Sequence, residues 1–216
     1  MKKIIPILSL FLIGGMLLSS CSKDPLDDMT AEESQIYITR KDSSANFSSY
    51  KTFSIVDSIA VANNSGEGKE LTDDDIKLIK LIKQHMQDRG YVLVDTTQSP
   101  DLGINIMRIS YTYLNVVPNN YWGYPGYWNT GYWGYPGSSY YFPPSFGYYP
   151  PMFRYYNTKS DVLTIDIIDL KNVKKDNKLE AVWNASMKGV GVLHPTFYEK
   201  EIDAIFKQSP YLNANK

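Results

Sequence analysis

A long uncharged stretch, rich in tyrosine, tryptophan, glycine and proline, divides the folded part of this chain in two. No charged side chain occurs between Arg108 and Arg154, and the hexapeptide "YWGYPG" occurs twice, at 121–126 and 132–137. Glycine and proline interrupt helices and strands, so no regular element can run through the whole stretch. The sequence therefore predicts an aromatic low-complexity insert over residues 118–157, placed between two strands of one domain.

Three interpretations of this insert remain open. In the first, the insert is a poorly packed hairpin extension that self-associates. In the second, it is a binding platform whose rings stack on sugars. In the third, it contacts the membrane interface, where tyrosine and tryptophan are enriched. All three place it outside the core, so we expect that replacing residues 119–155 with a short turn leaves the fold intact. The candidate residues for ligand or membrane contact are Tyr121, Trp122, Tyr127, Trp128, Tyr132 and Trp133.

The first twenty residues predict a lipoprotein signal peptide. Two lysines precede an apolar run at 4–18, which is shorter than the roughly 20 residues that a membrane-spanning helix needs. The run ends in Leu18-Ser19-Ser20-Cys21, which resembles a bacterial lipobox with cleavage between Ser20 and Cys21. We expect the Cys21 thiol to accept diacylglycerol, so that acyl chains such as palmitate attach the protein to a lipid bilayer.

The charge balance excludes one class of partner and bears on location. The formal net charge is −1, and removal of the two lysines of the signal peptide makes it −3, without a basic stripe. Nucleic-acid binding needs such a stripe, so we expect no nucleic-acid partner. Asp24, Asp27 and Asp28 resemble a Bacteroidota-type lipoprotein export signal. We expect outer-membrane anchoring, with the cell surface favoured over the periplasmic face, although a solvated tether over residues 21–46 explains the same acids.

The remaining chain predicts one domain, residues 47–212. Residues 72–90 read as an amphipathic helix, with a capping box formed by Thr72 and Asp75 and a terminal glycine at Gly90. A second helix is predicted from Thr196, with Glu199 as its capping partner. Residues 63–70 read as a loop, and a change in apolar phase at Met107–Arg108 suggests a bulge. Strands are predicted at 35–40, 50–56, 91–94, 102–113, 161–170 and 179–190.

This order of elements predicts the fold class. The connections between the predicted strands are short, which favours antiparallel pairing. We therefore expect a single α+β domain, with a mainly antiparallel sheet and two helices packed on one face.

Six ordered blocks resemble the domain of unknown function 4136. The resemblance covers about Phe47 to Tyr211 and implies a bacterial envelope lipoprotein, in agreement with Cys21. It implies no catalytic residues, and the aromatic insert departs from the family pattern. The blocks are "YKTFSIV" at 50–56, "DRGYVLVD" at 88–95, "SPDLGINI" at 99–106, "LTIDIIDLKN" at 163–172, "LEAVWNASMKG" at 179–189 and "EIDAIFKQSPY" at 201–211.

Motifs for metal, cofactor and nucleophilic chemistry are missing from the sequence. The two histidines, His85 and His194, are far apart and better suited to packing and to a loop or helix-start role, and the one cysteine is the lipidation site. No H-E-x-x-H, phosphate-binding loop or G-x-S-x-G occurs. We therefore predict no metal, no cofactor and no catalytic residue.

The carboxylates give no better case for catalysis. The aspartates at 73–75 suit a helix start, and Asp166 and Asp169 lie in an apolar strand where Asp166 is expected to face solvent. Glycoside cleavage needs two facing carboxyl groups about 5–10 Å apart, and a second one is not evident. We expect a non-catalytic lipoprotein that acts by binding or structural association, through its domain and aromatic insert, with a glycan, an envelope protein or itself. The alternative is a hydrolase acting on envelope or dietary glycans.

Overall fold

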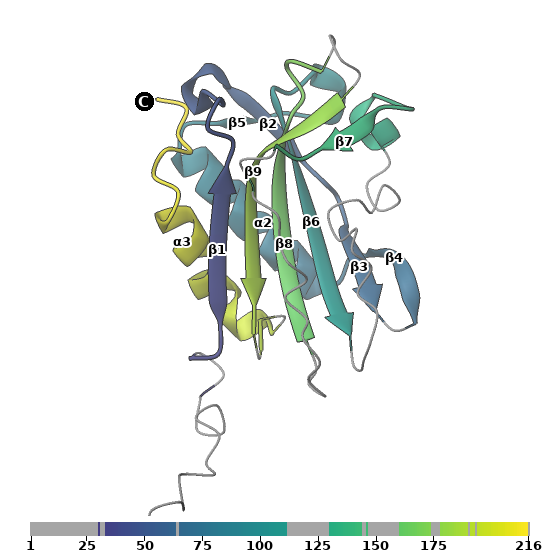
Figure 1. Ribbon diagram of the computed structural model, residues 1–216, viewed down its shortest axis with the longest axis vertical. Helices are drawn as coiled ribbons and strands as arrows, with labels where there is room; N and C mark the ends of the chain where they lie inside the picture. The colour runs from purple at the N-terminus through teal and green to yellow at the C-terminus, as the bar shows by residue number, and fades with distance from the viewer. Residues whose placement is uncertain are drawn as a thin grey trace, which may run out of the picture.

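The computed structural model describes residue 30 and residues 33–63, 65–111, 130–143, 146, 160–173, 178–189, 191–192 and 194–215. The predicted signal peptide, Cys21 and the first hexapeptide lie outside these ranges. Over the described residues the chain forms one mixed sheet of nine strands, with two helices on the same side of it (Figure 1). The predicted α+β class and the two helices on one face are confirmed.

The sheet has the path β1-β9-β8-β6-β2-β5; β3 pairs with β6, β4 pairs with β3, and β7 pairs with β9. The three successive pairs from the β1 edge, β1–β9, β9–β8 and β8–β6, are antiparallel. The strands are β1 (Ile36–Lys41), β2 (Thr52–Ile55), β3 (Ile59–Asn63), β4 (Gly66–Glu70), β5 (Val92–Leu93), β6 (Leu102–Tyr111), β7 (Ser139–Tyr141), β8 (Ser160–Asp169) and β9 (Lys178–Lys188).

Four pairs are parallel, which the short connections did not predict. The strand β2 runs parallel to both β5 and β6, β3 runs parallel to β6, and β7 runs parallel to β9. The reason for the first of these is that helix α2 crosses over between β2 and β5. A parallel connection needs a crossover of that kind. The sheet is thus mostly antiparallel, with a parallel part next to the helix.

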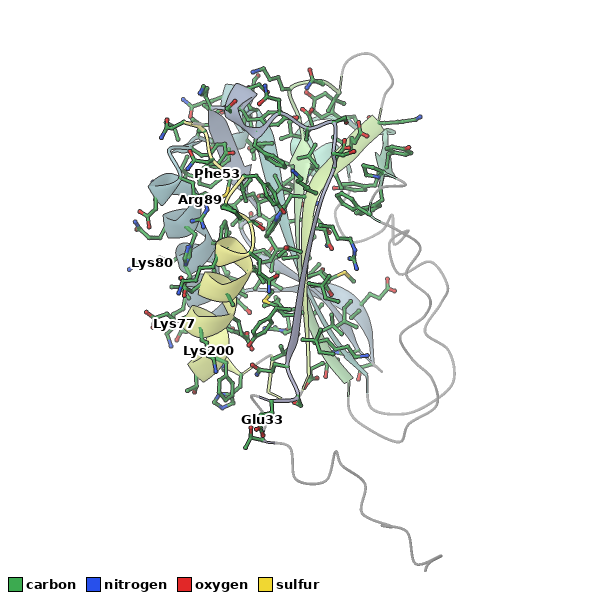
Figure 2. The ribbon with its side chains drawn as sticks, turned by 60° about the vertical axis from the view of Figure 1, so that its left-hand side comes forward. Glu33, Phe53, Lys77, Lys80, Arg89 and Lys200 are labelled. Carbon is green, nitrogen blue, oxygen red and sulfur yellow. The ribbon has the colours of Figure 1, made fainter. Side chains whose placement is uncertain are left out.

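Helix α2 (Asp73–Asp88) forms as the sequence predicts. The side chain of Thr72 accepts from the backbone of Asp75, and the Asp75 carboxylate accepts in return from the Thr72 backbone, so the predicted capping box is confirmed. Gly90 has φ +84, the left-handed conformation expected after a helix. The buried face of helix α2, which includes Leu78 and Ile82, packs toward the sheet. Figure 2 shows Lys77 and Lys80 on the outer side of the helix layer.

The second helix, α3 (Tyr198–Lys207), starts two residues later than predicted. A 3-10 turn at Pro195–Phe197 precedes it, and no side-chain cap closes its N-terminus, so the predicted capping box of Thr196 with Glu199 is wrong. Instead His194 caps the 3-10 turn, because its ring nitrogen accepts from the Thr196 backbone at 3.4 Å. The structural role predicted for His194 is confirmed.

Two other local predictions are wrong. Residues 63–70 are not a loop, because Gly66–Glu70 pairs antiparallel with β3 as strand β4. Strand β6 has no bulge at Met107–Arg108, since its register with β8 is continuous from Leu102 to Tyr111. The change in apolar phase has another cause. Arg108 lies on the helix face of β6 and reaches Asp75 of α2 at 2.6 Å.

The domain also begins earlier than residue 47. Strand β1 pairs with β9 over six residues, from Ile36 opposite Lys188 to Lys41 opposite Trp183, so this part of the predicted tether belongs to the sheet. Asp42 is buried as well. Among the described residues, no helix combines the length and hydropathy that crossing a membrane requires.

Candidate functional site

The second aromatic hexapeptide, residues 132–137, packs on the sheet face opposite the helices. Trp133 is 5% exposed and lies over Gly103 of β6, where a Cβ would come within 3.1 Å of the indole ring. Its Nε1 donates to Asn105 Oδ1 at 3.1 Å. Gly103 therefore provides the space that the ring fills, and Asn105 satisfies the one polar atom that the ring buries.

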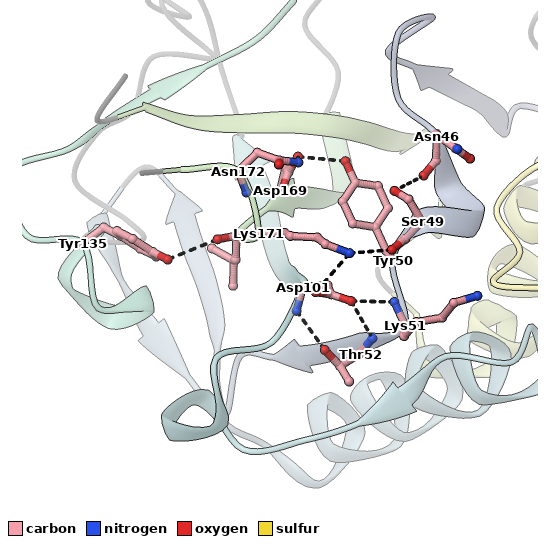
Figure 3. A network of polar contacts seen from close by, with 11 residues as sticks. Asn46, Ser49, Tyr50, Lys51, Thr52, Asp101, Tyr135, Asp169, Lys171 and Asn172 are labelled. Atoms are coloured by element: carbon pink, nitrogen blue, oxygen red, sulfur yellow. Dashed lines mark hydrogen bonds and ion pairs between the residues drawn. The ribbon is translucent and has the colours of Figure 1, made fainter. Parts of the chain in front are cut away.

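The flanking tyrosines attach the same hexapeptide to both sides of Trp133. The Tyr132 hydroxyl accepts from the backbone of Asp57 at 3.2 Å. The Tyr135 hydroxyl donates to the carbonyl of Leu170 at 3.1 Å (Figure 3). The following strand, β7, pairs with the first residues of β9, and its Tyr140 hydroxyl accepts from Asn105 Nδ2 at 3.3 Å.

These contacts correct two predictions from the sequence. Trp133 is a core residue and not an exposed platform ring, and Tyr132 is half-buried. The expectation that the whole insert is separate from the core is wrong, because Trp133 and Phe146 belong to the core and four partly buried rings pack against it: Tyr132, Tyr135, Tyr140 and Phe142. Replacing residues 119–155 would remove the Trp133 ring, which covers Gly103 together with Ile168 and Leu170. The candidates Tyr121, Trp122, Tyr127 and Trp128 lie outside the described residues.

A row of polar side chains crosses four strands on this same face. Arg40 of β1 stands opposite Asn184 of β9, Asn184 opposite Asp166 of β8, and Asp166 opposite Asn105 of β6. The amide of Asn184 joins the two charged groups, because its Oδ1 accepts from Arg40 at 3.1 Å and its Nδ2 donates to Asp166 at 2.7 Å. We call these four residues the polar row.

Burial differs along the polar row. Asn184 and Asn105 are 0% and 5% exposed, whereas Arg40 and Asp166 are half-buried. Burial raises the pKa of Asp166 to about 6, and the hydrogen bond from Asn184 opposes this rise only in part. The row thus offers an acceptor and a donor, separated by one amide, next to the Tyr140 ring. Such groups can bind a polar ligand that carries hydroxyl groups.

The expected exposure of Asp166 is therefore wrong, although its face is as predicted. It shares the face with Leu170, whose side chain lies against the same Gly103, while Ile165 and Ile167 are fully buried in the core. Among the described residues of strands β1, β9, β8 and β6, Asp166 carries the only carboxylate that lies on this face. The facing pair that glycoside cleavage requires is not present among them.

Other carboxylates hold the ends of strands together. Figure 3 shows Asp101, which accepts from the backbone of Lys51 at 2.6 Å and lies 3.7 Å from the Lys171 ammonium. Asp169 accepts from the buried Tyr50 hydroxyl at 2.8 Å, and burial beside this carboxylate raises the pKa of Tyr50. These contacts join the start of β2 to the start of β6 and the end of β8, which is a structural role.

The histidines do not form a metal site within the described residues. His85 stacks on Phe206 with ring centroids 4.7 Å apart, which confirms its predicted packing role, and burial lowers its pKa. Across the described part of the chain, no group of three or more His, Cys, Asp or Glu side chains could hold a metal ion.

Sequence reasoning missed Arg40, Asn105, Asn184 and Tyr140. A signal for two of them exists, because Asn105 and Asn184 each interrupt an apolar strand, as Asp166 does. The sequence did not provide the register that places the three side by side. That register depends on the pairing of β6 with β8 across the insert, a connection too long to fix it locally.

These features define a single-domain α+β protein built on a mixed nine-stranded sheet. The sequence profile of the family described as "Domain of unknown function (DUF4136)" matches residues 38–211. Because this is most of the chain, the protein belongs to that family, and the resemblance found in the six sequence blocks is confirmed. A search of curated proteins found no match.

The fold also resembles solved structures. A DUF4136 family protein from Bacteroides thetaiotaomicron has a TM-score of 0.65 and 25% identity, over 84% of this chain and 99% of that one. A PelC dodecamer from Paraburkholderia phytofirmans has a TM-score of 0.39 and 11% identity, over 84% of this chain and 100% of that one. A PDZ domain protein from Parabacteroides distasonis has a TM-score of 0.40 and 13% identity, over 82% of this chain and 37% of that one. Similarity as low as the last two adds nothing to the description of this chain.

Proposed function

We propose that this protein is an envelope lipoprotein that acts by binding, without catalysis, and that the sheet face opposite its helices is the binding surface. The polar row carries the proposal. A charged donor, a bridging amide and a charged acceptor lie in register across three strands, and the Tyr140 ring lies beside the fourth. Polar groups fixed by strands beside aromatic rings suit a hydroxyl-rich ligand such as an envelope glycan.

Anchoring is the second part of the proposal. The sequence Leu18-Ser19-Ser20-Cys21 supports processing at Cys21, and acylation there holds the domain at the outer membrane. Replacing Cys21 with alanine should leave the precursor unprocessed or release the protein into the soluble fraction. Membrane retention of a mature-size Cys21→Ala protein would contradict lipid anchoring.

Surface display is a separate part of the proposal, supported by the acids behind Cys21. The triple alanine variant of Asp24, Asp27 and Asp28 should reduce the labelling of intact cells by a membrane-impermeant reagent, with total membrane content unchanged. If the wild-type protein is labelled only after cell lysis, it faces the periplasm.

Binding is tested with the detergent-solubilised lipoprotein and purified peptidoglycan sacculi as the probe. Arg40→Gln and Asp166→Asn should each lower the fraction that sediments with the sacculi, because each removes one charged group of the row. Lys80→Gln, on the outer side of the helix layer, is the control and should sediment like the wild type. Equal sedimentation of all four proteins would show that the row does not bind this glycan.

The hydrolase alternative has one observation in its favour, the raised pKa of Asp166. A carboxyl group that titrates near pH 6 can act as a general acid. The same incubations distinguish the two functions. Binding leaves the sacculi intact, whereas hydrolysis releases soluble fragments in proportion to time and enzyme, and Asp166→Asn abolishes that release.

A further inference from the structure

The site that holds the second hexapeptide has specific contacts for nearly every residue of the motif. The hydroxyl groups of Tyr132 and Tyr135 bond to backbone groups of Asp57 and Leu170, and Trp133 bonds to Asn105. Gly134 and Gly137 both have φ +82, a conformation that side-chain-bearing residues rarely adopt. The site therefore recognises a tyrosine, a tryptophan, a glycine, a second tyrosine and a final glycine at fixed spacing.

The first hexapeptide, residues 121–126, presents the same groups in the same order. Each contact above can be made by its counterpart eleven positions earlier: Tyr121 for Tyr132, Trp122 for Trp133 and Tyr124 for Tyr135. The glycines that require positive φ correspond as well. Nothing within the motif distinguishes the two copies.

The chain is long enough to bring the first copy to the site. Trp122 follows the end of β6, Tyr111, by eleven residues, which can span up to roughly 36 Å. Asn105 lies six residues back along the same strand, at a distance of about 20 Å. Because both copies belong to one chain, they compete intramolecularly at a high effective concentration.

The residues on the C-terminal side of each motif decide which copy is preferred. On the C-terminal side of the second copy, the Tyr140 hydroxyl accepts a hydrogen bond from Asn105, and the ring centroid of Tyr141 lies 5.2 Å from the Lys178 ammonium. Eleven positions earlier these places are taken by Asn129 and Thr130, which have no ring. The second copy is therefore the stronger ligand, by these contacts alone.

We propose that the surface formed by Asp57, Gly103, Asn105 and Leu170 is an intramolecular peptide-binding site for the motif Tyr-Trp-Gly-Tyr-Pro-Gly, and that the first copy, residues 121–126, binds there in a minor population of molecules. Exchange of the copies releases Trp133 and Tyr140 from the sheet. The protein thereby has two registers of one aromatic segment. This inference does not depend on lipid anchoring or on glycan binding.

The test is a double-mutant cycle on the lipoprotein in detergent, with the melting temperature Tm as readout. Trp122→Ala alone should change Tm by less than about 1 °C, because the first copy is the minor ligand. In the Trp133→Ala background the first copy becomes the main ligand. There Trp122→Ala should lower Tm by a further 4 °C or so. Trp128→Ala, between the two motifs, is the matched control and should have no effect in either background.

Trp133→Phe provides the same cycle if Trp133→Ala does not fold, since it keeps a ring but loses the donor to Asn105. If Trp122→Ala is silent in both backgrounds, the proposal is overturned. A Trp122 effect that grows with protein concentration would also overturn it, because the motif would then come from a second copy of the chain.

Discussion

The helix face of the sheet is filled mainly by apolar side chains from α2, α3 and the strands, whereas the opposite face combines an aromatic hexapeptide with a row of amides and charges. On the helix face, Trp183 is fully buried and stacks on Phe206 at 5.8 Å between centroids. On the other face, Trp133 is buried to almost the same extent, but over a glycine and against Asn105. Two tryptophans of similar burial thus have different surroundings.

This difference bears on the proposed binding function. Most contacts of the helix face arise from apolar residues whose spacing already favours burial, and its buried polar groups include the Asp75–Arg108 ion pair and Glu201. The opposite face buries Asn105 and Asn184, which contribute less to stability than apolar residues would. What distinguishes the opposite face is that its amides are hydrogen-bonded to charged and aromatic side chains of neighbouring segments, and the proposed binding rests on that arrangement.

The largest expected effect is on the helix face. Trp183→Ala removes a ring that is 0% exposed, together with its hydrogen bond to Ser209, and should lower the free energy of unfolding by about 3–5 kcal/mol. Urea denaturation measures the loss. Val92→Ala, at a position 58% exposed, is the control and should change the free energy by less than about 0.5 kcal/mol. A loss below about 1 kcal/mol for Trp183→Ala would contradict the assignment of this face as the main core.

A buried carboxyl on the helix face should give a stabilising variant. Glu201 is 0% exposed, neither of its carboxylate oxygens has a hydrogen-bond partner among the described residues, and burial raises its pKa to about 8. The loss of folding stability caused by burying this carboxyl is absent below about pH 4.5, where the group is neutral in both the folded and the unfolded chain. The loss increases with pH as the group ionises in the unfolded chain, and it reaches its full size above about pH 8. Glu201→Gln should therefore stabilise the protein by on the order of 3 kcal/mol at pH 7.

The measurement for Glu201 is urea denaturation from pH 4 to pH 9. The difference between Glu201→Gln and the wild type should be near zero at pH 4, increase with pH, and level off above pH 8. A difference that is constant with pH would mean that this carboxyl is hydrated or paired in solution.

Gly103 tests the packing of the aromatic face. A Cβ at this position would lie 3.0 Å from both Ile168 and Leu170 and 3.1 Å from Trp133, so Gly103→Ala should cost about 1–2 kcal/mol. Gly68→Ala is the matched control, because its nearest neighbour, Val61, is 3.9 Å away. Equal stability of the two variants would show that Trp133 does not rest on β6.

The smallest expected effect concerns Asp166. Burial raises the pKa of Asp166 from 3.8 to about 6. The resulting loss of folding stability therefore develops between about pH 3.8 and pH 6 and is constant above pH 6. Because this side chain is partly exposed, Asp166→Asn should gain only about 1 kcal/mol at pH 7. The variant should bind less well while being more stable, and Glu201→Gln should be more stable with unchanged binding. If Asp166→Asn binds sacculi like the wild type, the polar row has no binding role.

The sequence predicted the helix face better than the opposite one. The capping box of Thr72 with Asp75 and the apolar stripe with Leu78 and Ile82 are local patterns, and helix α2 follows from them. By contrast, Gly103 and Asn105 acquire their roles only when residues 132–137 reach them from a distant part of the chain. No local period records such a contact.

The parallel strands and the polar row were missed for the same reason. Pairing of β3 with β6 and of β6 with β8 joins segments that are separated by α2 or by the insert. Composition also misled the interpretation of the insert, because glycine and proline indicate breaks in regular structure but do not exclude burial of the rings between them. Trp133 is the residue that shows this most clearly.

The central claim is that the second hexapeptide belongs to the core of the fold, with Trp133 enclosed against β6. A variant with Trp133 as its only tryptophan, made by Trp122→Phe, Trp128→Phe and Trp183→Phe, tests it by fluorescence. The account predicts native emission that is clearly blue-shifted from that of the urea-unfolded protein, and resistance to quenching by acrylamide. Native emission at the wavelength of the unfolded chain, with free access for the quencher, would contradict the account.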